Sequence, residues 1–246
     1  MEPLYVGAHW SPAGWVAVAF DDGTASVHDE IGELWAAVGE RAVQLLVDVP
    51  IGLVEEGDPE RPPDRLARDL LGDQAETIVT QPVREATRKR RYPAAQRVMA
   101  RKTDTDLSEP AFAASEPIAA VDELLAEVPE ARETIGAAHP ELCFRAFAGE
   151  PLDHPRETAG GYAERLRVLA EFDHDAPPTV QSAAEAVAGA PVRIEDVLDA
   201  AALAYTARPG PGELRTLPAE PTTDPTGLPM RLFYRSETPL ESATHR

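Results

Sequence analysis

Cysteine and lysine are the scarcest chemically active residues in this sequence. Among 246 residues there are two lysines, Lys89 and Lys102, and one cysteine, Cys143. A single cysteine excludes an internal disulfide and a multi-cysteine zinc site. Cys143 lies in the apolar run of residues 142–144, where a small buried residue is a better explanation than a catalytic thiol.

The sequence also lacks a long apolar stretch and a phosphate-binding loop. The longest segment without charged residues, 3–20, contains two prolines, two glycines and His9, so it predicts two strands around a turn rather than a membrane span. No basic-then-apolar segment opens the chain, and we expect a cytoplasmic protein without membrane contact. Gly160 and Gly161 lack the spacing and the lysine of a Walker loop.

Acidic residues dominate the charge. The chain has 43 acidic and 23 basic residues, a net charge of −20. With so little lysine, this composition favours a halophilic, salt-adapted protein over an ordinary acidic protein with a codon-driven arginine bias. The acidic excess repels nucleic acid at low salt, and added salt screens that repulsion.

The apolar patterning predicts three strands in a meander, then a helix, then a further strand. In that last strand apolar and polar residues do not alternate, which is typical of a parallel strand buried on both faces. This order of elements predicts an α/β fold. These five elements are predicted at residues 4–9, 15–20, 24–28, 29–39 and 42–47, with a tight turn at residues 21–23. Later helices are predicted near residues 65–71, 121–125, 162–172, 182–188 and 194–206, and strands near 134–139 and 230–234. We expect a single domain over residues 1–246 with a helical insertion around 60–130.

Asp48 directly follows the strand predicted over residues 42–47. In open α/β sheets, ligands gather beyond the carboxyl ends of the strands, so a carboxylate there can hold a metal or polarise water. A turn aspartate that caps the following amides explains Asp48 equally well.

A second acidic group lies at the start of the helix predicted over residues 194–206. Asp196 and Asp199 are three residues apart and share one helix face. The helix dipole explains Glu195 and Asp196 in the first turn, but Asp199 lies one turn later among leucine and alanine. A carboxylate in apolar surroundings is costly unless a cation or donors meet it, so we favour a functional role.

Glu141 and His139 flank Pro140. His139 is a candidate general base, although a lone histidine beside proline is more often structural. Pro140 at a helix start with Glu141 in the first turn is also ordinary helix N-terminal chemistry.

Residues 84–102 hold eight basic residues and a single acid, Glu85. Such a concentration of cations can contact phosphates, with an aromatic ring available for base stacking. The alternatives are internal ion pairs with the surrounding acids, or a subunit contact. The candidate nucleic-acid-binding residues are Arg84, Arg88, Lys89, Arg90, Arg91 and Tyr92.

Six motifs, in their order and spacing, resemble the domain of unknown function 429 family, a group described as predicted nucleases of RNase H-like fold. They are residues 48–53 (DVPIGL), 63–68 (PDRLAR), 139–144 (HPELCF), 160–165 (GGYAER), 196–200 (DVLDA) and 224–228 (DPTGL).

The resemblance implies an RNase H-like mixed sheet, with three antiparallel meander strands plus parallel strands and helices on both faces. It also implies a metal-dependent phosphodiesterase acting on nucleic acid, with two divalent ions held by carboxylates. Mg²⁺ suits such oxygen ligands, and Mn²⁺ also tolerates a nitrogen. The candidate catalytic residues are Asp48, Glu141, Asp196 and Asp199, and the candidate metal ligands are Asp48, Asp196, Asp199 and His9. Asp48 must then lie about 4–6 Å from Asp196 or Asp199, because each ligand–metal distance is about 2.0–2.6 Å.

One residue departs from the family's pattern. The family's first-strand motif is Gly-Val-Asp-Gly-Cys, whereas residues 7–11 read Gly-Ala-His-Trp-Ser, so His9 replaces the aspartate. A neutral imidazole removes one negative charge and one pair of bridging oxygens. Either the site binds a different metal, or this member has kept the fold and lost the chemistry. In the second case it is a non-catalytic module that binds a nucleic acid or protein partner through residues 84–102. Phosphoryl transfer on a small molecule is a weaker third reading, because the phosphate loops are missing.

The composition predicts that salt stabilises this protein. We expect its melting temperature to rise between low and molar salt, because screening relieves repulsion among the 43 acidic side chains. Calorimetric melting over a KCl series measures this directly. A melting temperature that stays flat or falls would contradict salt adaptation.

Overall fold

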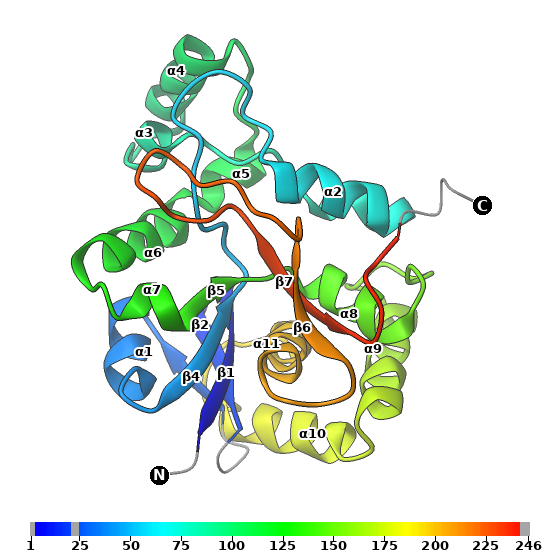
Figure 1. Cartoon of the computed structure of the whole chain (residues 1–246). Helices are drawn as coiled ribbons and strands as arrows, with labels where there is room; N and C mark the ends of the chain where they lie inside the picture. The colour runs from blue at the N-terminus through cyan, green and yellow to red at the C-terminus, as the bar shows by residue number, and fades with distance from the viewer. Residues whose placement is uncertain (1–2, 21–24, 242–246) are drawn as a thin grey trace.

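The computed structural model describes residues 3–20 and 25–241 (Figure 1). The turn predicted at residues 21–23 lies outside this part of the chain. No helix in the described part is long and apolar enough to cross a membrane. The elements are β1 (Leu4–Ser11), β2 (Gly14–Ala19), β3 (Ala25–His28), α1 (Ile31–Val38), β4 (Ala42–Val47), α2 (Pro62–Leu71), the 3₁₀ helix η1 (Gly72–Thr77), α3 (Arg84–Thr87), α4 (Tyr92–Thr103), α5 (Glu109–Ala113), α6 (Ser115–Glu127), α7 (Ala131–Thr134), β5 (Ile135–Ala137), α8 (Pro140–Ala148), α9 (Ala159–Phe172), α10 (Ala176–Ala186), α11 (Ile194–Ala207), β6 (Glu213–Leu217) and β7 (Leu232–Ser236).

Five strands form one open mixed sheet in the order β3-β2-β1-β4-β5. The first three are an antiparallel meander, β4 joins β1 in parallel, and β5 joins β4 in parallel. Helices lie about this sheet on both faces (Figure 1). The predicted RNase H-like α/β class is therefore confirmed. A separate antiparallel pair, β6 and β7, contacts it through a bridge between Ala138 and Phe233.

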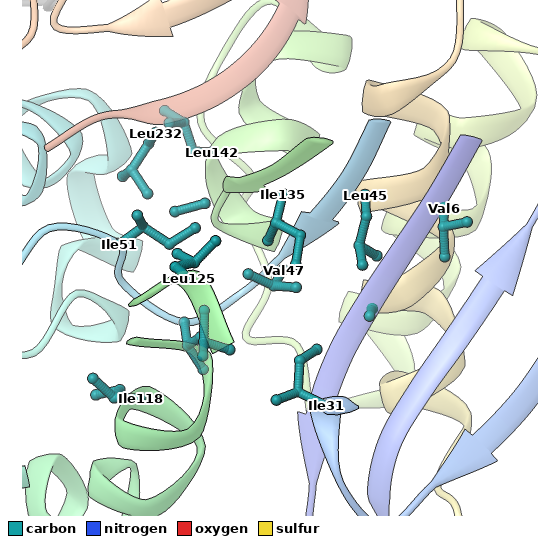
Figure 2. Packing of buried hydrophobic residues seen from close by; sticks show 14 of the residues in the cluster. Val6, Ile31, Leu45, Val47, Ile51, Ile118, Leu125, Ile135, Leu142 and Leu232 are labelled. Atoms are coloured by element: carbon teal, nitrogen blue, oxygen red, sulfur yellow. The ribbon is translucent and has the colours of Figure 1, made fainter. Parts of the chain in front are cut away.

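Alternation along the strands divides the core between the two faces. Val6 and Leu45 point to a cluster that includes residues of α1 and α6, as Figure 2 shows for several members. Val16 and Leu46 point to the other cluster, which α9, α10 and α11 cover. Because side chains alternate along a strand, His9 and Gly7 share the face that α11 covers.

Helix α11 approaches β1 so closely that its backbone occupies the space of a missing side chain. A Cβ atom on Gly7 would lie 2.1 Å from the Ala204 nitrogen and 2.3 Å from the Ala200 oxygen. All residues of α11 from Asp196 to Ala207 are buried. Glycine at position 7 is thus what allows the late helix to lie directly on the first strand.

The segment between β4 and β5 carries helices α2 to α7 and a small core of its own. In Figure 1 the α3–α4 part of this segment lies apart from the five-stranded sheet. Its core includes Val83, Met99 and Leu107, clustered separately from the two sheet cores.

A buried aspartate ties this insertion to the C-terminal part of the chain. The Asp224 carboxylate accepts hydrogen bonds from the backbone amides of Leu53 and Leu228, each at 3.0 Å, and pairs with the Arg84 guanidinium. Arg84 also contacts the Asp122 carboxylate of α6 at 3.1 Å. Burial opposes ionisation of Asp224, but these partners outweigh it and lower its pKa.

Several element boundaries differ from the prediction. Helix α10 begins at Ala176 rather than near residue 182, because its prolines lie in the first turn, where their missing amides cost nothing. The prediction that residues 42–47 are buried throughout is wrong in the first half, since Val43 is 53% exposed. Helix α4 and strand β6 were not predicted. The cations of α4 and the short, partly buried span of β6 leave no clear apolar period.

The close contact at Gly7 predicts a strong effect of adding one methyl group. Gly7→Ala must push α11 away from β1, and we expect a loss of about 3 kcal/mol in the free energy of unfolding. Gly32→Ala is the matched control, because a Cβ at that helical position meets nothing within 4 Å; it should be neutral or slightly stabilising. Urea unfolding of both variants measures the difference. Equal stability of the two would contradict the packing described here.

The Asp224 network predicts a pH-dependent contribution to stability. Since folding lowers the pKa of Asp224, its contribution is complete above the unfolded pKa of about 3.9 and disappears as pH falls through the folded pKa. We expect Asp224→Asn to cost about 3 kcal/mol at pH 7 and progressively less toward pH 3. Urea unfolding across this range, with wild type at each pH, checks the trend. A cost that stays constant with pH would rule out the ionised network as its source.

Candidate functional site

The ends of two parallel strands place His9 beside Asp48. The register of β1 and β4 pairs Ala8 with Val47, so the next residues on each strand are neighbours. The imidazole Nδ1 of His9 forms an ion pair with Asp48 Oδ2, and the Trp10 amide donates to Asp48 Oδ1 at 2.9 Å. Both side chains lie where an open α/β sheet presents its ligands.

The first turns of α11 bring two more carboxylates to the same point. His9 Nε2 lies 3.5 Å from Asp196 Oδ1, and His9 Nδ1 lies 3.8 Å from Asp199 Oδ2. Asp196 also receives the Arg193 backbone amide at 3.0 Å, which caps the helix. His9 therefore lies among carboxylates from β4 and α11, which places Asp48 on the same side of the sheet as the late helix.

Arg156 completes the cluster and was not predicted from the sequence. Its guanidinium Nη2 lies 2.8 Å from Asp199 Oδ2 and 3.9 Å from Asp196 Oδ1, and its side chain is 28% exposed. It lies in the loop between α8 and α9, where no periodicity marks it. We refer to His9, Asp48, Asp196, Asp199 and Arg156 as the His9 centre.

The carboxylates keep His9 protonated. Burial alone would lower the pKa of His9, but Asp48, Asp196 and Asp199 raise it to about 10. Burial likewise opposes ionisation of Asp196, yet hydrogen bonds from His9 and Arg193 lower its pKa to about 2. At Asp199 burial outweighs the nearby cations and raises the pKa to about 6. Near neutral pH the centre thus contains an imidazolium, whereas a metal ligand must be a neutral imidazole.

The implied Mg²⁺ or Mn²⁺ can be tested against these residues. The carboxylates are the oxygen donors that both ions prefer. However, His9 and Arg156 already supply two positive charges to them. No group of three or more acidic, histidine or cysteine side chains in the described residues is arranged to hold a metal. As they stand, these residues do not fit a divalent ion.

Glu141 lies close to this centre but is bound to another partner. The Arg165 guanidinium forms two hydrogen bonds with its carboxylate, at 2.6 and 3.1 Å, and both side chains are buried. A paired, buried carboxylate of this kind orders α8 against α9, and a catalytic role for Glu141 stays a prediction. The neighbouring His139 is kept neutral, because burial lowers its pKa.

Many cations of residues 84–102 form ion pairs within the protein. Arg84 and Arg88 contact Asp122, and Lys89 contacts Glu85 at 3.5 Å. The Tyr92 hydroxyl donates to the Leu107 carbonyl at 2.6 Å. Its ring packs on Phe112, with 5.5 Å between the ring centroids.

Two predicted nucleic-acid contacts in this stretch remain available. Within the described residues, Arg90 and Arg91 are exposed and form no ion pair. Nucleic-acid binding by this segment stays a prediction, which now depends chiefly on these two arginines.

A cavity of about 160 Å³ is lined in part by Asp48 of the centre. Its lining residues also include His139, and Arg61 and Asp64 of the α2 region. The sequence motif at residues 63–68 pointed to this segment, but nothing in it indicated a cavity.

Comparison with known proteins identifies the family. The model of DUF429, described as a protein of unknown function, matches residues 10–223. This match includes Asp48, Asp196 and Asp199 and begins one residue after His9. No curated protein and no solved structure matches the chain. Because the family model covers most of the chain, this protein belongs to the DUF429 family.

Proposed function

We propose that this protein is an RNase H-like phosphodiesterase that acts on nucleic acid at the His9 centre, in a form whose own cations take the place of metal ions. The observation that carries the proposal is the convergence of Asp48, Asp196 and Asp199 on one side chain of the first strand. These carboxylates come from the strand end and the late helix, the positions that hold metals in the RNase H-like superfamily. The departure is confined to the first strand, where the imidazolium of His9 stands in place of a carboxylate.

The roles of the individual side chains follow from their partners. His9 holds Asp48 and Asp196 in fixed positions through both ring nitrogens. Arg156 is the most exposed cation of the centre, so its planar guanidinium can meet the oxygens of an incoming phosphodiester. When Arg156 turns to the phosphate, Asp199 loses that partner and can orient a water molecule and accept its proton as the water oxygen bonds to phosphorus. The bond between phosphorus and the leaving oxygen then breaks, and the leaving oxygen takes up a proton from solvent.

A binding module without catalysis is the second candidate. It is supported by Arg90 and Arg91, which are exposed on an otherwise acidic protein. The ion pairs of Arg84, Arg88 and Lys89 weigh against it, because side chains engaged with acids contribute less to phosphate binding.

The proposal predicts cleavage that needs no added metal. Wild type should cleave end-labelled RNA or DNA oligonucleotides slowly in EDTA, with less than about a twofold change on adding Mg²⁺ or Mn²⁺. Asp199→Asn and Arg156→Ala should each lower the rate at least about tenfold, because they remove the proposed water-orienting and phosphate-binding groups. Glu157→Gln, an exposed carboxylate next to Arg156, is the control that should leave the rate unchanged. Gel analysis of the products measures all four proteins.

The role of His9 has a separate readout. Calorimetric titration of Mg²⁺ and Mn²⁺ should show no binding to wild type at millimolar concentration, but should show binding to His9→Asp, which restores the family's carboxylate. Tight binding to wild type would overturn the view that His9 and Arg156 replace the metal. If neither protein cleaves any oligonucleotide under any of these conditions, the phosphodiesterase proposal is wrong and the binding module remains.

A further inference from the structure

The loop that carries Arg156 is bound by a buried carboxylate. This loop connects α8 to α9, and Glu164 of α9 reaches back to it. The Glu164 carboxylate accepts hydrogen bonds from the backbone amides of Asp153 at 3.0 Å and His154 at 2.9 Å. Glu164 is only 7% exposed, and a buried carboxylate is costly unless donors meet it. Both of its oxygens meet this loop, so Glu164 fixes the backbone two residues before Arg156.

The carbonyl groups of the same loop are also bound. Arg165 Nη1 donates to the His154 carbonyl at 2.9 Å, and the Thr158 hydroxyl donates to the Pro155 carbonyl at 2.8 Å. Arg165 is itself oriented by its two hydrogen bonds with Glu141. The backbone directly before the arginine is therefore held through its amides and through its carbonyls.

Gly161 allows α9 to lie against this loop. A Cβ atom on Gly161 would lie 2.0 Å from the Pro155 oxygen and 2.8 Å from the carbonyl carbon of that residue. Both are backbone atoms, so a side chain at this position would displace the loop. Gly161, Glu164 and Arg165 all belong to the GGYAER motif at residues 160–165, to which the proposed function gives no role. All three contact the loop that carries the arginine of the His9 centre.

Arg156 depends on a fixed backbone because its charge lies at the end of a long side chain. Its guanidinium reaches Asp199 Oδ2 at 2.8 Å, and its side chain is 28% exposed, so packing holds it only in part. Displacing a functional group by about 1 Å can lower a reaction rate about a hundredfold. The position of the loop therefore decides whether the guanidinium meets Asp199 and an incoming phosphodiester.

We infer that Glu164 is a positioning residue for Arg156, because its carboxylate holds the loop where the guanidinium meets Asp199. Glu141 acts one step further away, by orienting Arg165. The effect of Glu164 on cleavage rests on the proposed phosphodiesterase function, whereas its effect on the contact between Arg156 and Asp199 does not. The two effects can therefore be measured separately.

The first test is a double-mutant cycle in urea unfolding at pH 8, where Asp199 is ionised because its pKa is about 6. Arg156→Ala should raise the unfolding constant of wild type at least about fivefold, because it removes a cation from the buried Asp199 carboxylate. In Glu164→Ala the same change should raise it less than about twofold, because the displaced loop no longer brings the guanidinium to Asp199. If Glu164 only stabilised the loop, the two effects would be additive.

The second test repeats the cycle with cleavage of the end-labelled oligonucleotides. Glu164→Ala should lower the rate of wild type at least about tenfold, but that of Arg156→Ala less than about twofold, because only an arginine that is present can be displaced. Glu171→Ala is the matched control, because it removes an exposed carboxylate from the last turn of the same helix. It should change neither the cleavage rate nor the effect of Arg156→Ala.

A second variant displaces the loop without removing a charge. Gly161→Ala must push the Pro155 carbonyl away, so it should reduce the effect of Arg156→Ala on unfolding in the same way as Glu164→Ala. If Glu164→Ala does not fold, Glu164→Gln takes its place, since its side-chain amide keeps one accepting oxygen for the loop.

The outcomes separate this inference from the proposed activity. Coupling in unfolding would establish the positioning role even if no oligonucleotide is cleaved, and only the phosphodiesterase proposal would then be wrong. Equal effects of Arg156→Ala in wild type and in the Glu164 and Gly161 variants would overturn the inference, even if the protein cleaves nucleic acid. So would an Arg156→Ala variant that is as stable as wild type. Coupling in unfolding with additive effects on the cleavage rate would reject the role of Glu164 in cleavage.

Discussion

The contact between β1 and α11 is the constraint on which the rest of this structure depends. The helix backbone lies against Gly7 with no space for a Cβ atom, and the same helix contributes Asp196 and Asp199. Two residues further along β1, His9 faces the same helix and meets both carboxylates. The sheet register then adds Asp48 from β4. The packing of one helix on one strand thus sets the geometry of the whole charged centre.

Charge balance is the second constraint at this centre. Several carboxylates forced together at a strand end repel one another, and a cation must compensate them. Here the compensating positive charges belong to side chains of the protein itself, His9 and Arg156. Such cations are already held in place by the fold, so a divalent ion gains little by entering. His9 and Arg156 thus supply positive charge to the carboxylates of this centre.

The insertion between β4 and β5 has two separable roles. In its outer part, many basic side chains form ion pairs within the protein. One of these, between Arg84 and Asp224, ties the insertion to the C-terminal segment. Its inner part, around Arg61 and Asp64, leaves buried polar atoms without partners beside Asp48. The first arrangement stabilises the fold, whereas the second places a cavity beside Asp48. The DPTGL motif at residues 224–228 belongs to the first role, since its aspartate accepts backbone amides rather than lining a site.

Local pattern determined much of the fold. Alternating and continuous apolar runs, together with turn residues, predicted the meander, the strand that ends at Asp48 and the helix that carries Asp196 and Asp199, because each signal lies within a few neighbouring residues. The apolar neighbours of Asp199 even indicated that a cation or hydrogen-bond donors must meet it. Only the tertiary structure decided which cation that is, because Arg156 follows no period and reaches Asp199 from a distant loop. The protonation of His9 likewise depends on carboxylates from separate elements. The cavity lined by Asp48 and Asp64 is also formed by residues that lie far apart in the sequence. The spacing of residues along the chain does not determine how close such side chains come in the folded protein.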